Sequence, residues 1–183
     1  MKKLLLFLIV PFLSFGQDSE IYRVLENVEG VEFREYMPLF FASYIDGEDA
    51  ENSSFRVLAN YIFGSNDTGE EIAMTSPVVI RRFNSNEMLF RMPKKYNKKN
   101  IPKPNNTNIK FLETNSVQKA VIQYSGYTNL EKENRKIAEL KTLLDKQGVE
   151  HSHKFELFIY DPPYKLFNRR NEISVNIVTP RLN

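Results

Sequence analysis

The chain has 183 residues, of which 42% are hydrophobic, and its formal net charge is +2. This length suits one domain, and the apolar content is sufficient for a buried core. Cysteine is absent, which excludes disulfide bonds and metal sites built from thiolates.

The N-terminus has the pattern of a secretory signal peptide. Two lysines follow the first methionine, an apolar run extends from Leu4 to Phe15, and Ser14 and Gly16 form a small-x-small cleavage site. The run is shorter than the ~20 residues that a membrane-spanning helix needs. We therefore expect a signal peptide over residues 1–16, cleavage after Gly16, and a secreted or periplasmic single domain over residues 17–183. The alternative is an uncleaved N-terminal anchor.

Loss of the two lysines lowers the count of Lys and Arg from 25 to 23, which equals the 23 Asp and Glu. The mature protein is then nominally neutral. Whole-protein charge therefore gives no argument for binding to nucleic acid.

The first half of the mature chain predicts four strands and one helix. The strands are expected where apolar residues alternate or cluster, at residues 31–34, 40–45, 72–83 and 87–92. Helical spacing of apolar residues predicts a helix over residues 49–63, with Asp49 as N-cap and Gly64 as the C-terminal stop. Pro77 is expected to place an edge, bend or bulge in the third strand.

The second half repeats this order after a connector over residues 93–108. Strands are expected at residues 109–113, 117–124, 155–159 and 173–177. Thr128 and Glu131 form a capping box at the start of the second helix, and Gly148 ends it. The core stripe of this helix is expected to contain Leu130, Ile137, Leu140 and Leu144.

Each half thus consists of strand, strand, helix, strand, strand. We expect an α+β fold in which two pseudo-repeated halves form a distorted antiparallel β-barrel, with one helix packed on each half. An ordinary α+β sandwich is the alternative.

Three separate segments together resemble the SOUL haem-binding protein family. They are the first helix with its Gly64-Ser65-Asn66 end, the run Met74-Thr75-Ser76-Pro77-Val78, and the loop from Tyr160 to Glu172. The resemblance covers about residues 28–178. It implies the barrel described above and non-covalent binding of haem or a related tetrapyrrole against the first helix and this loop.

The candidate ligand-binding residues on the first helix combine apolar and polar groups on a face that flanks its core stripe. They are Phe55, Arg56, Ala59, Asn60 and Phe63. A flat apolar macrocycle with carboxylate arms needs apolar surface and a cation at the rim, and Arg56 can pair with a propionate in bidentate geometry. The alternative is a broad core stripe beside a solvated arginine.

The loop after the double proline adds a second candidate wall. Its ligand-binding candidates are Lys165, Leu166, Phe167 and Arg169. The alternative is a surface hairpin in which Arg169 or Arg170 pairs with Glu172.

Iron ligation is the point at which the sequence departs from the family. A histidine near the first helix is favoured as the ligand in some members, but here the only histidines are His151 and His153. We expect them to be exposed loop residues, with a haem or metal pair as the weaker alternative. The lack of cysteine also removes thiolate ligation and covalent haem attachment.

The expected function is therefore that of a haem carrier, buffer or scavenger with an apolar groove and a cationic rim. The alternatives are a binding protein for another small, amphipathic, anionic ligand and a hydrolase-like enzyme acting on such a ligand. No phosphate loop or nucleophile elbow is present. We expect no nucleic-acid partner and, after signal cleavage, no integral membrane segment.

Overall fold

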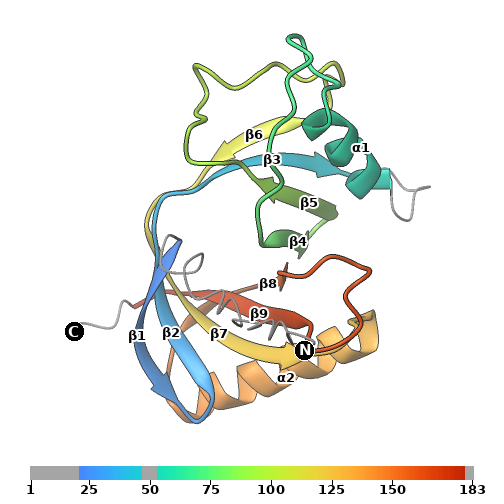
Figure 1. Cartoon of the computed structure of the whole chain (residues 1–183). Coiled ribbons are helices and arrows are strands. Elements are labelled where there is room, and N and C mark those ends of the chain that lie inside the picture. The colour runs from blue at the N-terminus through green and yellow to red at the C-terminus, as the bar shows by residue number, and fades with distance from the viewer. Residues whose placement is uncertain (1–20, 47–52, 180–183) are drawn as a thin grey trace, which may run out of the picture.

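The computed structural model describes residues 21–46 and 53–179. Within these residues, nine strands form one antiparallel sheet that carries two helices (Figure 1). The strands are β1 (Tyr22–Val28), β2 (Val31–Tyr36), β3 (Phe40–Ile45), β4 (Val78–Arg82), β5 (Asn86–Arg91), β6 (Lys110–Glu113), β7 (Val117–Ser125), β8 (His151–Ile159) and β9 (Arg170–Ile177). The helices are α1 (Ser53–Ile62) and α2 (Leu130–Lys146).

The sheet has the strand order β1-β2-β7-β9-β8-β4-β5-β3-β6 and curls into a half-barrel. The chain crosses between the two ends of this order through residues 37–39 and 114–116, which lie side by side (Figure 1). Here the Thr114 N–H donates to the Leu39 carbonyl at 2.8 Å, and the Leu39 N–H donates to the Thr114 hydroxyl at 2.9 Å. These bonds hold the curled sheet together where the two crossings meet.

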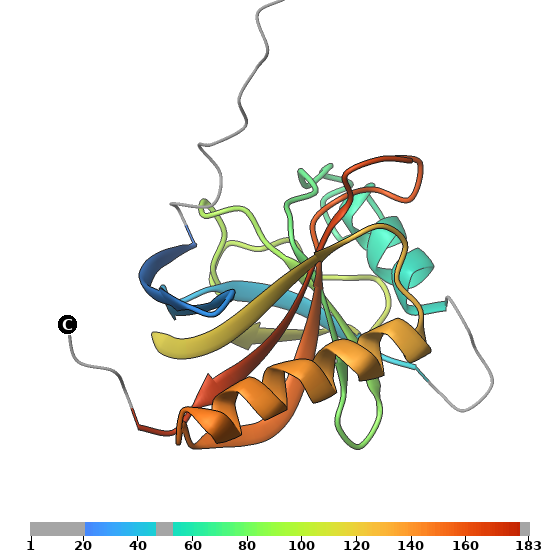
Figure 2. The same ribbon diagram turned by 90° about the horizontal axis from the view of Figure 1, so that it is seen from below.

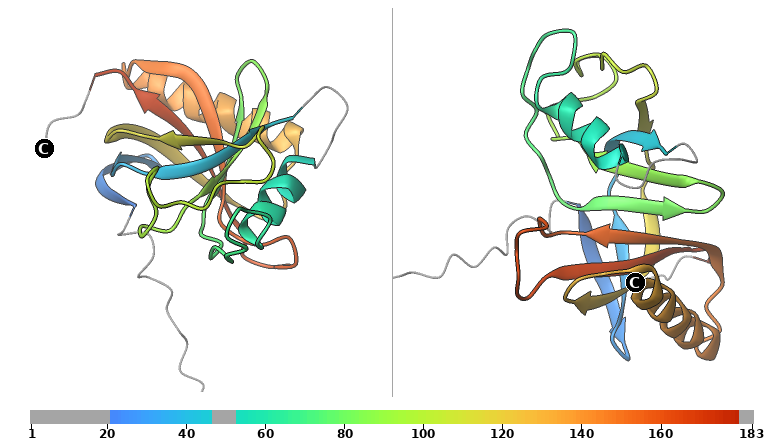
Figure 3. Two further views of the ribbon diagram at one scale, coloured as in Figure 1. Left: turned by 90° about the horizontal axis from the view of Figure 1, so that it is seen from above. Right: turned by 90° about the vertical axis from the view of Figure 1, so that its right-hand side faces the viewer.

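The two helices cover opposite parts of the curled sheet. Helix α1 packs on β3 and β5, whereas α2 packs on β7 and β9 (Figures 2 and 3). The core under α1 includes Leu58 and Ile62, and the core under α2 includes Leu140 and Leu144. Burial of one such side chain contributes about 1.5–3 kcal/mol, so these helices are held mainly by tertiary packing.

Side chains alternate between the two faces of each strand, and the face away from the helices forms the inside of the half-barrel. A third apolar cluster lies there, with Ile21, Tyr36, Phe41, Val79 and Phe158 among its buried members. Polar and charged side chains share this inner face, as described below. The sheet therefore buries both of its faces.

The fold class is confirmed as α+β with a curled antiparallel sheet. The interpretation as two repeated halves stays a prediction, because β1 is an additional strand and the ladder is continuous. Alternation did not reveal β1, since it is an edge strand whose register shifts between Val24 and Glu26. A bulge of this kind interrupts the period of two.

The third predicted strand is shorter than expected, because β4 begins only at Val78. Proline has no N–H to donate to a ladder, and Pro77 stands immediately before the strand. Residues 72–77 instead form a connection in which Ile72 is buried. The run with Met74 was thus wrongly assigned to a strand.

The start of α2 differs by one residue from the predicted capping box. Asn129 is the N-cap, and its side chain accepts from the Lys132 N–H at 2.9 Å. The Thr128 hydroxyl instead bonds the Tyr124 hydroxyl. Leu130 is 59% exposed and does not belong to the core stripe. It is the first residue of α2, where the helix extends beyond the part that packs on the sheet.

Two predicted helix stops are confirmed by positive φ angles. Gly64 has φ +102° and Gly148 has φ +64°, values that favour glycine. The predicted N-cap Asp49 and the signal peptide over 1–16 lie outside the described residues. Neither α1 nor α2 is long and apolar enough to cross a membrane.

Candidate functional site

The predicted residues of α1 occupy two different environments. Leu58 and Ile62 are buried in the core, as their helical spacing predicts. Arg56 and Asn60 are exposed on the outer face, and Phe63, which is 67% exposed, follows the helix directly. The sequence therefore places a cation, an amide and an aromatic ring on one solvent-facing side.

Phe55 and Ala59 lie between this outer side and the core. Phe55 is 39% exposed, and its ring stands edge-on to Phe90 with 5.4 Å between the ring centroids. Ala59 is buried and belongs to the core cluster under α1. Of the two, Phe55 therefore offers free ring surface, whereas Ala59 has little room for a larger side chain.

The loop between β8 and β9 presents a second apolar surface. Tyr164, Leu166 and Phe167 are exposed by 82%, 65% and 79%. A single exposed apolar side chain needs no explanation, but a group of them often marks a binding surface. Lys165 lies among them and pairs with Asp161 at 2.7 Å.

Arg169 shapes this loop from within. Its side chain is buried, and its Nη1 donates to the carbonyls of Pro162 and Lys165 at 2.7 and 3.1 Å. Its guanidinium also stands over the ring of Tyr127, 4.7 Å from the centroid. Arg169 thus closes the loop on itself, and its direct contact with a ligand stays a prediction.

The loop and α1 lie on the same side of the molecule (Figures 1 and 2). They come from parts of the chain that are far apart in sequence. The fold therefore places the two candidate walls, with Arg56 and Phe63 in one segment and Lys165 and Phe167 in the other, on the same side of the molecule.

The prediction that both histidines are exposed loop residues is wrong in part, because both lie in β8 and only His153 is exposed. His151 begins β8 and is buried, and its ring centroid is 4.3 Å from that of His153. Burial, followed by the charge of His153, lowers the pKa of His151. The pair stands at the opposite end of β8 from the Tyr160 loop. Among the described residues, no group of three or more His, Cys, Asp or Glu could hold a metal ion.

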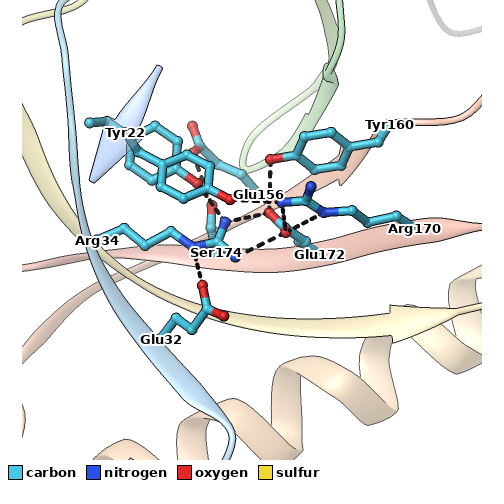
Figure 4. A network of polar contacts seen from close by, with 9 residues as sticks. Tyr22, Glu32, Arg34, Glu156, Tyr160, Arg170, Glu172 and Ser174 are labelled. Atoms are coloured by element: carbon cyan, nitrogen blue, oxygen red, sulfur yellow. Dashed lines mark hydrogen bonds and ion pairs between the residues drawn. The ribbon is translucent and has the colours of Figure 1, made fainter. Parts of the chain in front are cut away.

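A buried polar network on the inner face is the feature that sequence reasoning missed (Figure 4). Glu172 is its centre and is fully buried. Arg34 binds both of its carboxylate oxygens, at 2.8 and 3.0 Å, and Arg170 Nη2 approaches Oε1 at 2.7 Å. The Tyr160 hydroxyl donates to Oε2 at 3.0 Å. The pairing of Arg170 with Glu172 belongs to the alternative interpretation of this loop as a surface hairpin; the pair is present, but Glu172 is buried.

The same face holds a second carboxylate with two cations. Glu156 Oε2 lies 2.5 Å from Lys119 Nζ, and Oε1 lies 2.7 Å from Arg81 Nε. Ser174 is close to Oε2 at 3.4 Å. Burial alone would raise the pKa of Glu156, but the nearby Lys119 and Arg81 charges hold it below its ordinary value.

The ionisable groups of this network keep one protonation state near neutral pH. Burial works against the charged form of Arg34, but its bonds to Glu172 raise its pKa. Burial raises the pKa of Tyr36 and of Tyr160. These three groups therefore keep their protons near neutral pH. Arg34 and Tyr160 donate hydrogen bonds to Glu172, whereas the Tyr36 hydroxyl accepts one from Arg34.

The charged residues of this network could be seen in the sequence, but their burial could not. Arg34, Lys119, Glu156 and Glu172 each stand inside a strand beside at least one apolar residue. Charged side chains in such positions usually face water. They could be recognised as buried only once the curled sheet was known.

Comparison with known proteins identifies relatives over most of the chain. A model of the SOUL heme-binding protein family matches residues 18–176. Heme-binding protein 1 of Xenopus laevis is 30% identical over 159 residues, covering 79% of this chain and 83% of that protein. Heme-binding protein 1 of Sus scrofa is 29% identical over 134 residues, covering 69% and 70%.

Solved structures share the fold at much lower identity. The C-terminal domain of EcmrR is 12% identical with a TM-score of 0.59, covering 85% of this chain and 97% of that one. A hydrolase from Listeria innocua is 9% identical with a TM-score of 0.57, covering 84% and 94%. These likenesses concern the fold alone. The match over residues 18–176 shows more: the chain belongs to the SOUL heme-binding protein family.

Proposed function

We propose that this protein binds haem or a related tetrapyrrole non-covalently between the outer side of α1 and the loop between β8 and β9, and that it carries, buffers or scavenges this ligand outside the cytoplasm. Membership of the SOUL family supports a tetrapyrrole ligand. The observation that carries the location is the exposure of Phe63 and Phe167 on two elements that lie on the same side of the molecule.

The side chains on these two elements fit a porphyrin in chemistry. A porphyrin has two apolar faces and carboxylate arms, so it needs aromatic or aliphatic walls with cations at the edge. Phe55, Phe63 and Phe167 offer ring surface, and Arg56 and Lys165 supply positive charge beside it. Arginine matches a carboxylate in bidentate geometry.

Iron ligation by histidine does not fit this location. His151 and His153 stand at the far end of β8, and the other described residues include no histidine. The protein's own contribution is therefore to hold the macrocycle by its faces and carboxylates. A bound haem would supply redox-active iron, which the protein shields in part from water.

Export is supported by the sequence of residues 1–16, with its lysine pair, apolar run and cleavage motif. Outside the cytoplasm, a haem-binding domain would keep a poorly soluble ligand dispersed.

A haemin titration of the purified protein, followed at the Soret band, tests the proposal. We expect saturable one-to-one binding at low micromolar haemin. Phe63→Ala and Phe167→Ala should each weaken binding tenfold or more, since loss of a buried aromatic contact is worth roughly 1.5–3 kcal/mol. Val24→Ala is the matched control, because Val24 is also exposed but lies on edge strand β1.

The titration has a second arm with metal-free protoporphyrin. Similar affinity for both ligands is expected if the faces and carboxylates carry the binding. Non-saturating uptake, or equal affinity in the wild type and both phenylalanine variants, would contradict the proposed location.

A further inference from the structure

A pocket of about 260 Å³ opens on the inner face of the half-barrel, apart from α1 and the loop between β8 and β9. Its apolar wall is formed by side chains from strands β3, β4, β7 and β8 and from the residues just before β1 and β3: Ile21, Leu39, Phe41, Val79, Val117 and Phe158. The crossings at Leu39 and at residues 114–116 form its rim, and Lys119, Arg81 and Glu156 form its charged part. We propose that this pocket is a second ligand site and that it binds a small organic carboxylate with an aromatic body.

The charge of the lining favours an anion. Arg81 and Lys119 are cations, and Glu156 is the one carboxylate among the lining residues. Both oxygens of Glu156 are already occupied, Oε1 by Arg81 and Oε2 by Lys119. A ligand ammonium would therefore meet a neutralised carboxylate and one surplus positive charge. Glu87 also approaches Arg81 at 3.5 Å, and both side chains are partly exposed, so water screens this outer pair and Lys119 is the more deeply buried cation of the site.

One N–H group of the Lys119 ammonium is available to a ligand. Its ammonium has three N–H groups, and two of them point to Glu156 at 2.5 Å and to Asn176 at 2.6 Å. Among the described residues, no oxygen or nitrogen atom accepts the third, and the centroid of the Phe158 ring lies 5.8 Å from Nζ. Its side chain is only 9% exposed, so an incoming carboxylate would meet this N–H with little competition from water.

Buried charge of this kind costs stability compared with an apolar core of the same shape. A cluster of Lys119, Arg81 and Glu156 beside a concave apolar wall is therefore a candidate binding site on physical grounds. The aromatic rings of Phe41 and Phe158 in that wall suit an aromatic ligand body, because rings pack favourably edge to face.

The size of the pocket separates it from the proposed haem site. Pockets for drug-sized ligands usually have about 300–1,000 Å³, and this one is slightly smaller. It suits a ligand of a single ring and a short chain. A tetrapyrrole does not fit inside it.

The test compares 4-phenylbutyrate with 4-phenylbutylamine by isothermal titration of the purified protein. The two probes have the same apolar body and opposite charge. We expect saturable binding of the carboxylate and at least tenfold weaker binding of the amine. Equal binding of both probes, or binding of neither, would overturn the proposal.

Two variants test whether the carboxylate binds in this pocket. Lys119→Met removes the free donor and should weaken phenylbutyrate binding tenfold or more, whereas Lys146→Met removes an exposed lysine that pairs with Glu29 on the surface and should change it less than twofold. Val117→Trp fills the pocket from its partly exposed edge and keeps the charged groups. It therefore tests the location of the site even if Lys119→Met fails to fold. Unchanged affinity in Val117→Trp would contradict the site.

Haemin distinguishes this proposal from the preceding one. Lys119→Met should keep wild-type haemin affinity, and haemin should not displace phenylbutyrate. Displacement together with a parallel loss of both affinities would mean that only one site exists. Failure of haemin to bind beside intact phenylbutyrate binding would overturn the haem proposal alone.

Discussion

Arg34 and Glu172 form a bidentate ion pair although they are 138 residues apart in the chain. The side chains of both are almost completely buried, with 1% and 0% exposure. The pair joins β2 to β9 across the intervening strand β7, and Arg170 and Tyr160 complete the coordination of the carboxylate.

Loss of the Glu172 charge should destabilise the fold strongly. Glu172→Gln leaves two guanidiniums beside a neutral group, and breaking a buried pair in this way typically costs about 3–5 kcal/mol. Urea unfolding followed by circular dichroism measures the change. Glu87→Gln is the control, because its partly exposed pair with Arg81 should be worth less than ~1 kcal/mol. Equal effects of the two changes would show that the buried network does not stabilise the protein.

Stability should fall at acid pH through Glu156. Its pKa in the folded protein lies below the ordinary value of 4.5, so the stabilisation is complete above that value and is lost as pH falls through the folded pKa. The free energy of unfolding of the wild type and of Glu156→Gln should therefore differ most near neutral pH and converge as the pH falls below the folded pKa of Glu156. A difference that does not depend on pH would contradict the assignment.

Charge reversal should weaken haemin binding in a salt-dependent manner. Arg56→Glu and Lys165→Glu each place a negative charge where a propionate is expected, and added salt should reduce the difference from the wild type. Lys146→Glu is the control on the far end of α2. Soret titrations at low and high salt measure the affinities. If the reversals bind haemin as the wild type does at low salt, the propionates lie elsewhere.

The two histidines should be dispensable for haemin binding. Changing His151 and His153 to Ala should leave the affinity within about threefold, which is under ~0.7 kcal/mol, because the pair lies at the other end of β8 from the loop. A hundredfold loss with a shifted Soret maximum would mean that an imidazole ligates the iron.

Export should produce a shortened protein. N-terminal sequencing after expression in a Sec-competent host is expected to begin at Gln17, because the small residues Ser14 and Gly16 precede that position. Recovery of a cytoplasmic product that retains Met1 would contradict the localisation.

Helix α1 shows how well helical spacing predicts which residues are buried. Leu58 and Ile62 were correctly predicted as core, because a core stripe repeats every three to four residues. Ala59 was predicted to face the ligand, yet it is buried in the core cluster under α1. Ala59→Trp is therefore expected to overpack that core at a cost of about 1–3 kcal/mol, which makes it unsuitable as a test of binding.

The loop between β8 and β9 shows a different limit. The double proline and the mixture of rings and cations predicted a ligand wall, and Phe167 is indeed exposed. The sequence does not distinguish Lys165, which is partly exposed, from Arg169, which is buried against the loop's own carbonyls. That difference depends on how the loop folds back on itself.

By itself, the sequence determined the local elements: strands from the alternation of apolar residues, helices from their spacing, and helix ends at Gly64 and Gly148. These signals act over a few residues, so they can be read along the chain. Only the tertiary structure decided that Lys119 meets Glu156 and that Arg34 meets Glu172, because strand order and register bring these residues to one face. A charged side chain in a strand has the same local pattern whether it faces water or a neighbouring strand, and the curling of the sheet over its inner face makes these charges buried.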